Sequence, residues 1–232
     1  MTAAPLLSVV TPAFDEAPSL PLLHARLAAA LAELDDLEGS RPAWEWIVVD
    51  DGSRDGTGET LARLTASDPR VRGLRLDRNR GSHPAILRGL ADARGAAVLV
   101  LAADLQDPPE LTPQLLALWR QGARIVWAVR GRREGDGRLT VALANLYHGL
   151  LRRFGGAPGL PAGGAGFCLL DRSVVDALCR RTPPPVDVFA AAGRLPVPAA
   201  AVSYDRAPRR HGHSRWSLGR KLHFAIRSLL AS

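Results

Sequence analysis

The stretch from Val98 to Glu110, VLVLAADLQDPPE, runs from a strongly apolar segment directly into a loop with two carboxylates. Val98–Leu101 has the length and the β-branching of a buried central strand. Asp104 and Asp107 follow, with Gln106 between them. Hard oxygen ligands at the carboxyl end of such a strand are typical of sites for a divalent cation or a phosphate-bearing ligand. The simpler interpretation is an acidic turn that caps the following helix, since Asp before Pro-Pro-Glu is ordinary chemistry for a helix start.

Two earlier segments have the same form, an apolar strand that ends in an acidic loop. Leu6–Thr11 reads as a first buried strand, and the loop 12–16 that follows it contains Asp15 and Glu16. Trp46–Val49 reads as a second strand and runs into the octet 50–57, DDGSRDGT, whose glycines suit positive φ and whose Asp, Ser and Thr side chains can cap a helix. Because parallel strands end at one edge of a sheet, these acidic loops are expected to lie together.

The rest of the chain continues an alternation of strands and helices. Strands are expected over 71–76, 98–102, 124–129 and 167–170, with an edge strand over 197–204, and helices over 85–93, 109–120 and 139–150. A basic amphipathic helix is expected from Trp216 to Leu230. This rhythm predicts an α/β fold with a doubly wound, mostly parallel central sheet flanked by helices and joined by right-handed crossovers.

Composition narrows the class of protein. The chain has 232 residues, 47% of them hydrophobic, which suits one α/β domain with a sizeable core. Its net charge is +7 and Lys221 is its only lysine, and arginine suits bidentate phosphate contacts. Only 5% of residues are aromatic and no basic helix is interleaved with aromatic residues, which argues against nucleic-acid binding. Cys168 and Cys179 lack metal-ligand spacing and are expected to be buried free thiols.

The apolar segments point to a cytoplasmic protein. No run approaches the roughly 18 to 20 residues that a membrane-spanning helix needs. The N-terminal segment has no charged region before its apolar run, so we do not expect it to be a signal peptide.

The order of the motifs closely resembles glycosyltransferase family 2, and within it the branch of dolichol- or polyprenyl-phosphate sugar transferases. The matching segments are SVVTPAFDE, VVDDGSRDGT, the Arg80-Gly81 loop, ADLQDPPE, the Arg130 loop, FCLLDRSVVDAL and RRHGHSRW. The resemblance spans nearly the whole chain. It implies a GT-A (Rossmann-like) fold, a UDP-, GDP- or dTDP-linked sugar donor, Mg²⁺ or Mn²⁺, and inversion at the anomeric carbon.

The resemblance also implies roles for individual residues. Asp104 and Gln106 match positions that hold the metal and the diphosphate, and Arg130 matches an arginine on the phosphate side. Asp104, Arg130, Arg209 and Arg215 are therefore the expected catalytic residues. The expected donor-binding residues are Thr11, Pro12, Ala13, Glu16, Asp50, Asp51, Asp104, Gln106, Arg130, Arg209, Ser214 and Arg215. Of the pair Asp50 and Asp51, we expect Asp51 in particular to face the nucleobase. Asp107 is expected to cap the helix that follows.

The chain departs from the family pattern at three places. Ala102 stands where many relatives carry the first carboxylate of Asp-x-Asp, which predicts weaker metal holding. Gly166 stands where the branch usually has an acceptor-side aspartate before Phe167. A lipid phosphate acceptor is already ionised and needs no strong base, whereas a sugar hydroxyl would need one, with Asp171 or Asp136 as candidates. The third departure concerns the basic helix expected from Trp216. In polyprenyl-phosphate relatives transmembrane helices follow it, whereas this sequence ends at Ser232.

The expected function is transfer of a sugar from a nucleotide donor to a polyprenyl phosphate in cell-envelope glycan synthesis. Alternatives are a soluble transferase that acts on a saccharide or small-molecule hydroxyl, and a catalytically silent nucleotide-sugar-binding protein. One GT-A domain is expected over 1–215, with a nucleotide-binding half over about 1–130 and an acceptor-side half over about 131–215. Residues 216–232 would form a helix able to lie on the inner face of the cell membrane.

Overall fold

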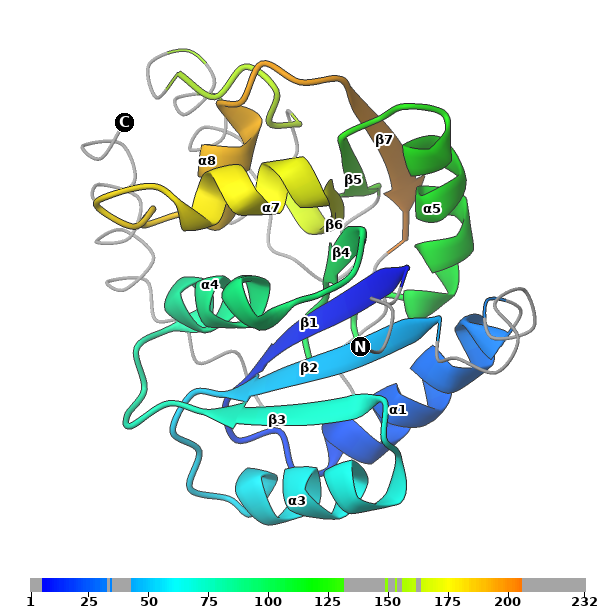
Figure 1. Ribbon diagram of the computed structural model, residues 1–232, viewed down its shortest axis with the longest axis vertical. Coiled ribbons are helices and arrows are strands. Elements are labelled where there is room, and N and C mark those ends of the chain that lie inside the picture. The colour runs from blue at the N-terminus through cyan, green and yellow to red at the C-terminus, as the bar shows by residue number, and fades with distance from the viewer. Residues whose placement is uncertain are drawn as a thin grey trace.

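The computed structural model describes residues 6–32, 34, 43–131, 149, 153, 156–161 and 164–205. Within them a seven-stranded sheet runs in the order β3-β2-β1-β4-β6-β5-β7, with helices on both faces (Figure 1). Neighbouring strands are parallel except around β6, which is antiparallel to both β4 and β5. The expected mostly parallel α/β sheet is confirmed.

The element bounds agree closely with the sequence pattern. The strands are β1 (Leu7–Ala13), β2 (Trp44–Asp50), β3 (Val71–Arg75), β4 (Ala97–Val100), β5 (Ile125–Arg130), β6 (Ala165–Asp171) and β7 (Ala199–Tyr204). The helices are α1 (Ser19–Ala30), α3 (Thr57–Ser67), α4 (Ser82–Asp92), the 3-10 turn η1 (Pro109–Leu111), α5 (Thr112–Arg120), α7 (Arg172–Cys179) and α8 (Val188–Gly193). β7 lies at the edge of the sheet, as predicted. The short helix α8 was not expected from the pattern.

Two apolar cores lie on the two faces of the sheet. One contains Leu23 of α1, Trp46 of β2 and Leu115 of α5, and the other contains Ile86 of α4, Val49 of β2 and Val174 of α7. Residues alternate between the two cores along β2 because successive strand side chains point to opposite faces. The sheet is therefore buried on both sides, which explains its nearly continuous apolar strands.

Strand β1 continues through Pro12, beyond the expected end at Thr11. Its pairing with β4 ends at Val10, whereas its pairing with β2 runs on to Ala13. A proline cannot donate a hydrogen bond to a ladder and is tolerated where one side of the strand is unpaired. The strand can include Pro12 because β4 has already turned away at that point.

Other expectations have mixed outcomes. Cys168 is a buried free thiol, but Cys179, at the end of α7, is exposed, so the prediction for Cys179 was wrong.

The helices expected over 139–150 and 216–230 lie outside the described residues, apart from Gly149. The division of the domain into two halves stays a prediction. Within the described ranges, no helix is both long and apolar enough to cross a membrane.

Candidate active site

The carboxyl ends of β1, β2 and β4 meet at one edge of the sheet, here called the carboxyl edge. The loops after β1 and β2 are joined there by hydrogen bonds. The Asp51 N–H donates to the Ala13 carbonyl at 2.8 Å, and the Asp15 N–H donates to Ser53 Oγ at 2.8 Å. The Glu16 N–H donates to Thr57 Oγ1 at 2.9 Å. The acidic loops are therefore brought together, as the sequence predicted.

Thr11, Pro12, Ala13 and Glu16, the four donor-binding candidates from the first strand and loop, differ in accessibility. Thr11 and Ala13 are buried, and Thr11 Oγ1 accepts a hydrogen bond from Trp46 Nε1 at 2.9 Å. Pro12 and Glu16 are partly exposed. Glu16 Oε2 accepts a hydrogen bond from Ser19 Oγ at 2.8 Å, at the start of α1. Pro12 and Glu16 are thus the two whose side chains a ligand can reach, and the role of all four stays a prediction.

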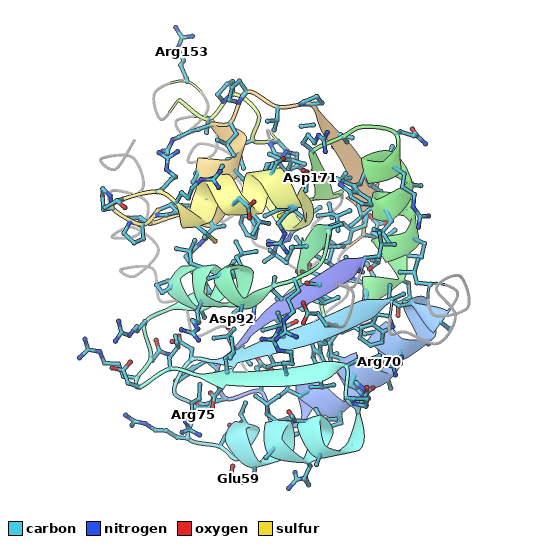
Figure 2. All side chains as sticks on the ribbon, in the orientation of Figure 1. Glu59, Arg70, Arg75, Asp92, Arg153 and Asp171 are labelled. Atoms are coloured by element: carbon cyan, nitrogen blue, oxygen red, sulfur yellow. The ribbon has the colours of Figure 1, made fainter. Side chains whose placement is uncertain are left out.

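Asp50 ends β2 with a fully buried carboxylate. Its Oδ1 accepts a hydrogen bond from the Ser53 N–H at 2.8 Å. Its Oδ2 has no hydrogen-bond partner among the described residues, and the nearest cation is Arg75 Nη1 at 3.4 Å. Arg75 ends β3 at this edge, whereas Arg70 lies beyond the other end of that strand (Figure 2). The Arg75 side chain is 59% exposed. The buried Asp50 carboxylate therefore lies beneath a solvent-accessible guanidinium, that of Arg75.

The Asp51 carboxylate holds the next loop. Its two oxygens accept hydrogen bonds from the backbone N–H groups of Arg80 at 2.7 Å and Gly81 at 2.8 Å. Burial raises the pKa of Asp51 above its ordinary value; the two backbone hydrogen bonds oppose this rise, and the charge of Asp50 adds to it. Asp51 thus fixes the Arg80-Gly81 loop against β2. Its expected contact with a nucleobase stays a prediction.

The loop after β4 alternates between buried and accessible residues. Leu101, Ala103, Leu105, Asp107 and Pro109 are buried, and Ala102, Asp104, Gln106 and Pro108 are partly exposed. Positions 102, 104 and 106 are therefore the accessible ones between Leu101 and Asp107. Asp104 and Gln106, the residues predicted to hold a metal and a diphosphate, are thus accessible to a ligand, as is Ala102, and their roles stay predictions.

A turn at Leu105 lies between Asp104 and Gln106. Leu105 has φ 62°, which is unusual for a residue with a side chain, and it is anchored by packing into the core. Its carbonyl accepts a hydrogen bond from Arg26 Nη1 at 3.3 Å. The Asp104 carboxylate accepts one from the Gln106 N–H at 3.3 Å. Leu105 is therefore buried at this turn, while Asp104 and Gln106 on either side of it remain partly exposed.

The prediction that Asp107 caps the following helix was wrong. The residue at the N-cap of η1 is Pro108, and no side chain caps that turn. Asp107 is 1% exposed, and its Oδ1 accepts a hydrogen bond from the Tyr204 hydroxyl at the end of β7. The carboxylate turns inward because the alternation of the loop puts position 107 on the buried side.

Arg130 ends β5 at the carboxyl edge, next to Tyr204 in the register of β5 and β7. Its Nε atom is buried and has no hydrogen-bond partner among the described residues. Arg209, Ser214 and Arg215 lie outside the described residues, so their expected roles as phosphate ligands stay predictions.

Of the two candidates for a base, the structure argues against Asp171, and Asp136 stays a prediction. Asp171 pairs with Ala97 at the start of β4, at the sheet edge opposite the one where Asp104 lies. It caps α7 through the Ser173 N–H and accepts hydrogen bonds from Trp119 Nε1 and Arg124 Nη1, both at 2.8 Å. Burial alone would raise the pKa of Asp171, but hydrogen bonds from Ser173, Trp119 and Arg124 outweigh it and lower the pKa to about 2. The antiparallel direction of β6 puts Asp171 at the wrong edge. Asp136 lies outside the described residues.

The residues present fit a cation that arrives together with a diphosphate. Among the described residues, no group of three or more His, Cys, Asp or Glu side chains could enclose a metal ion. Mg²⁺ commonly takes one or two carboxylates and completes its shell with phosphate oxygens and water. Asp104 offers one carboxylate on an accessible turn, and Gln106, two positions further on, is also partly exposed. That donor set suits an open site shared with a ligand.

Sequence reasoning missed Arg75 and Tyr204. Arg75 occupies the last position of β3, so the rule that ligands bind at strand carboxyl ends could have identified it. Tyr204 ends an edge strand without any flanking motif, and its partner Asp107 is 97 positions away. No local signal could have paired these two residues.

These features define an α/β protein whose parallel strands end in accessible acidic loops suited to a phosphate-bearing ligand. The chain belongs to Glycosyl transferase family 2, whose sequence pattern matches residues 8–179. An uncharacterized glycosyltransferase from Synechocystis is 34% identical over 223 residues, which cover 95% of this chain and 67% of the relative. The bactoprenol glucosyl transferase of Shigella phage SfV is 35% identical over 170 residues, which cover 73% of this chain and 53% of the relative.

A third relative is the undecaprenyl-phosphate 4-deoxy-4-formamido-L-arabinose transferase of Pseudomonas syringae. It is 35% identical over 219 residues, which cover 90% of this chain and 60% of the relative. The chain thus spans between about half and two thirds of the length of these relatives.

Solved structures share the fold. Mannosyl-3-phosphoglycerate synthase from Rubrobacter xylanophilus superposes with a TM-score of 0.64 at 23% identity, over 97% of this chain and 72% of that one. Glucosyl-3-phosphoglycerate synthase from Mycobacterium tuberculosis, solved with Mn²⁺, UDP and phosphoglyceric acid, gives a TM-score of 0.63 at 20% identity, over 97% and 78% of the two chains. The GT-A fold implied by the sequence resemblance is confirmed.

Proposed function

We propose that this chain is an inverting, metal-dependent glycosyltransferase that moves a sugar from a nucleotide donor to a polyprenyl phosphate. The observation that carries the proposal is the Asp104–Gln106 turn after β4, where both polar residues are partly exposed. Family membership and relatives named for bactoprenol and undecaprenyl phosphate support it.

Transfer from a nucleotide-sugar donor requires a site that stabilises the departing diphosphate. Negative charge grows on the diphosphate as the glycosidic bond breaks, so fixed positive charge lowers the barrier. Arg130 would supply such a charge at the end of β5, and Asp104 with Gln106 would hold Mg²⁺ or Mn²⁺. The cation, when bound, supplies Lewis-acid stabilisation of the phosphate oxygens. The nucleoside of a UDP-, GDP- or dTDP-sugar would lie along the loops that contain Glu16, Asp50 and Arg75.

The absence of a carboxylate at position 166 favours a phosphate acceptor over a sugar hydroxyl. An ionised lipid phosphate attacks without losing a proton, whereas a hydroxyl needs a general base within hydrogen-bond reach. Position 166 is glycine, and Asp171 lies at the opposite sheet edge. We therefore prefer the lipid phosphate. We propose that the chain works on the cytoplasmic side of the membrane, with residues 216–232 on its inner face.

A panel of UDP-, GDP- and dTDP-sugars with Mn²⁺ or Mg²⁺, measured by thermal shift, tests the donor site. A donor that binds the native state raises the apparent melting temperature by mass action. The matching donor should do so only with the cation, and Asp104→Ala should abolish the cation-dependent part. Asp77→Ala removes an exposed carboxylate outside the Asp104 turn and serves as the control. A panel without any shift would overturn the donor assignment.

Transfer itself is tested with the matching donor and two acceptors. We expect product with undecaprenyl phosphate in detergent and none with free saccharides. If product forms only with saccharides, the proposed acceptor is wrong and the acceptor is a sugar hydroxyl. Donor binding without turnover on any acceptor would identify a nucleotide-sugar-binding protein.

Flotation with anionic liposomes, compared with a chain that ends at Arg215, tests the membrane contact, and equal flotation would exclude residues 216–232 as the contact.

A further inference from the structure

Four segments converge on a small cluster at the carboxyl edge, in which Asp107 and Tyr204 are buried and Arg130 and Gly166 are partly exposed. The four segments are the loop after β4 with Asp107, the end of β5 with Arg130, the start of β6 with Gly166, and the end of β7 with Tyr204. Arg130 is the register partner of Tyr204, and the Gly131 N–H donates to the Tyr204 carbonyl at 2.8 Å. Asp107 belongs to the same loop as Asp104. The cluster therefore joins the proposed metal turn to the second half of the sheet.

The Tyr204 hydroxyl is the donor at the centre of this cluster. Tyr204 is 7% exposed, its ring packs edge-on against Phe167 with centroids 5.3 Å apart, and its hydroxyl donates to Asp107 Oδ1. Burial and the Asp107 carboxylate raise the pKa of Tyr204 well above its ordinary value, against the opposing charge of Arg130. The phenol therefore stays protonated, and able to donate, throughout the physiological pH range.

Gly166 makes room for that phenol. It lies at a bulge, because β5 pairs Ala128 with Phe167 and Val129 with Ala165, which leaves Gly166 as the extra residue. A Cβ atom at Gly166 would overlap the Tyr204 hydroxyl oxygen and lie 2.9 Å from Tyr204 Cζ and 3.2 Å from Arg130 Nε. Position 166 can carry a side chain only if Tyr204 moves, so the two residues depend on each other.

We propose that Tyr204 is a positioning residue of the transfer site: packed over Gly166, its hydroxyl fixes Asp107 and thereby the Asp104–Gln106 turn relative to Arg130. The inference rests on the proposed function, since it concerns the same turn. The loop after β4 then has two anchors. Arg26 holds it from α1 through the Leu105 carbonyl and a bidentate pair with Glu110, and Tyr204 holds it from β7.

A double-mutant cycle with Tyr204→Phe and Asp107→Ala, each of which removes the hydrogen bond between the two side chains, tests the positioning role. Tyr204→Phe keeps the ring and removes only the hydroxyl. We expect turnover to fall by about 10- to 100-fold, because small displacements of catalytic groups cost that much, with little change in the KM for the donor. The double variant should be no slower than the slower single variant, because both changes remove one interaction.

Trp119→Phe is the matched control for a purely structural effect. It removes a hydrogen bond of the same kind, from Trp119 Nε1 to the buried Asp171 carboxylate, at the opposite edge of the sheet. We expect this variant to lose stability and keep its turnover. Tyr204→Phe with wild-type turnover, or single effects that simply add, would overturn the positioning role while leaving the proposed function in place. A wild-type chain that turns over no donor would overturn both.

The dependence between Gly166 and Tyr204 is tested by stability alone, without substrate. Gly166→Ala should lower the melting temperature by several degrees in the wild-type background and by clearly less in a Tyr204→Leu background, where the phenol is gone. Gly149→Ala, whose added Cβ meets no described atom within 4 Å, is the control. Equal losses in both backgrounds would show that the phenol does not require glycine at position 166 and would overturn the packing on which the proposal stands.

Discussion

Asp50 and Asp51 are neighbours in the chain, yet their carboxylates bind different segments at the carboxyl edge. Asp51 accepts hydrogen bonds from the backbone N–H groups of Arg80 and Gly81, whereas Asp50 accepts one from the Ser53 N–H and lies 3.4 Å from Arg75 Nη1. The alternation of side chains along an extended segment separates them. Asp51 is thus committed to holding a loop, and Asp50 has an oxygen close to an accessible guanidinium.

Replacing Asp51 should loosen the loop that it holds. We expect Asp51→Ala to lower the free energy of unfolding by about 1–3 kcal/mol, because two N–H groups lose their acceptor. Urea unfolding measures the loss. Asp51→Asn, which keeps one accepting oxygen, should lose less. Wild-type stability in Asp51→Ala would contradict the loop-holding role.

Replacing Gly52 should disturb the segment that leads into the Arg80-Gly81 loop, because Gly52 packs against Arg78 and Asn79. Gly52 has φ +74°, and an added Cβ would lie 2.8 Å from the Arg78 carbonyl carbon and 2.9 Å from the Asn79 nitrogen. Gly52→Ala therefore adds a clash with backbone to a left-handed strain of about 1 kcal/mol. The matched control is Gly56→Ala, with φ +90° and its nearest atom, Glu59 Oε2, at 3.8 Å. Chemical denaturation should give a clearly larger loss for Gly52→Ala, and equal losses would exclude the clash.

Introducing a carboxylate at position 102 should strengthen cation binding without harm to the fold. Ala102 is partly exposed, as Asp104 is, so Ala102→Asp would add a second accessible carboxylate to the same loop. We expect the Mn²⁺ concentration that gives half of the nucleotide-dependent thermal shift to fall on the order of tenfold, since affinity follows the number of charged ligands. Ala103→Asp is the control.

Ala103 is 3% exposed, so the control variant should lose stability and gain no affinity for Mn²⁺. Unchanged Mn²⁺ dependence in Ala102→Asp would show that position 102 does not face the cation.

Acidification should destabilise the protein through His83. Its side chain is 12% exposed, and its Nδ1 accepts a hydrogen bond from the Val188 N–H at 3.1 Å. Burial lowers the pKa of His83, and the Asp187 carboxylate opposes this effect. Below about pH 6.5 the unfolded chain takes up a proton that the folded chain resists, so stability falls as pH falls, by up to about 1.4 kcal/mol per pH unit.

Urea unfolding between pH 7.5 and 5 measures this slope, and His83→Asn should reduce it. Asp187→Asn, whose side chain can still cap α8, should extend the slope to lower pH because it removes the opposing charge. A slope that His83→Asn leaves unchanged would assign the acid sensitivity to other groups.

Much of this architecture was predictable because it depends on local pattern. Apolar runs followed by turn residues identified β1, β2 and β4, and the rule that parallel strands end at one edge placed Asp50 and Asp104 there. The prediction for Asp107 failed because the spacing before Pro108 suits a cap, and only the alternation around Leu105 shows that position 107 turns inward. The prediction for Asp171 failed because a short apolar strand does not reveal its direction. β6 runs antiparallel and therefore delivers Asp171 to the opposite edge.

The amino-acid sequence by itself determined the α/β class, the family and the loop that contains Asp104, because these follow from periodicity and from motifs whose residues are close together in the chain. Only the tertiary structure decided that Tyr204 meets Asp107 across 97 positions and occupies the space above Gly166. That contact depends on the strand order at the far side of the sheet, where β6 and β7 both adjoin β5. Pairing over such a separation is set by packing of the whole sheet and leaves no mark in the local pattern.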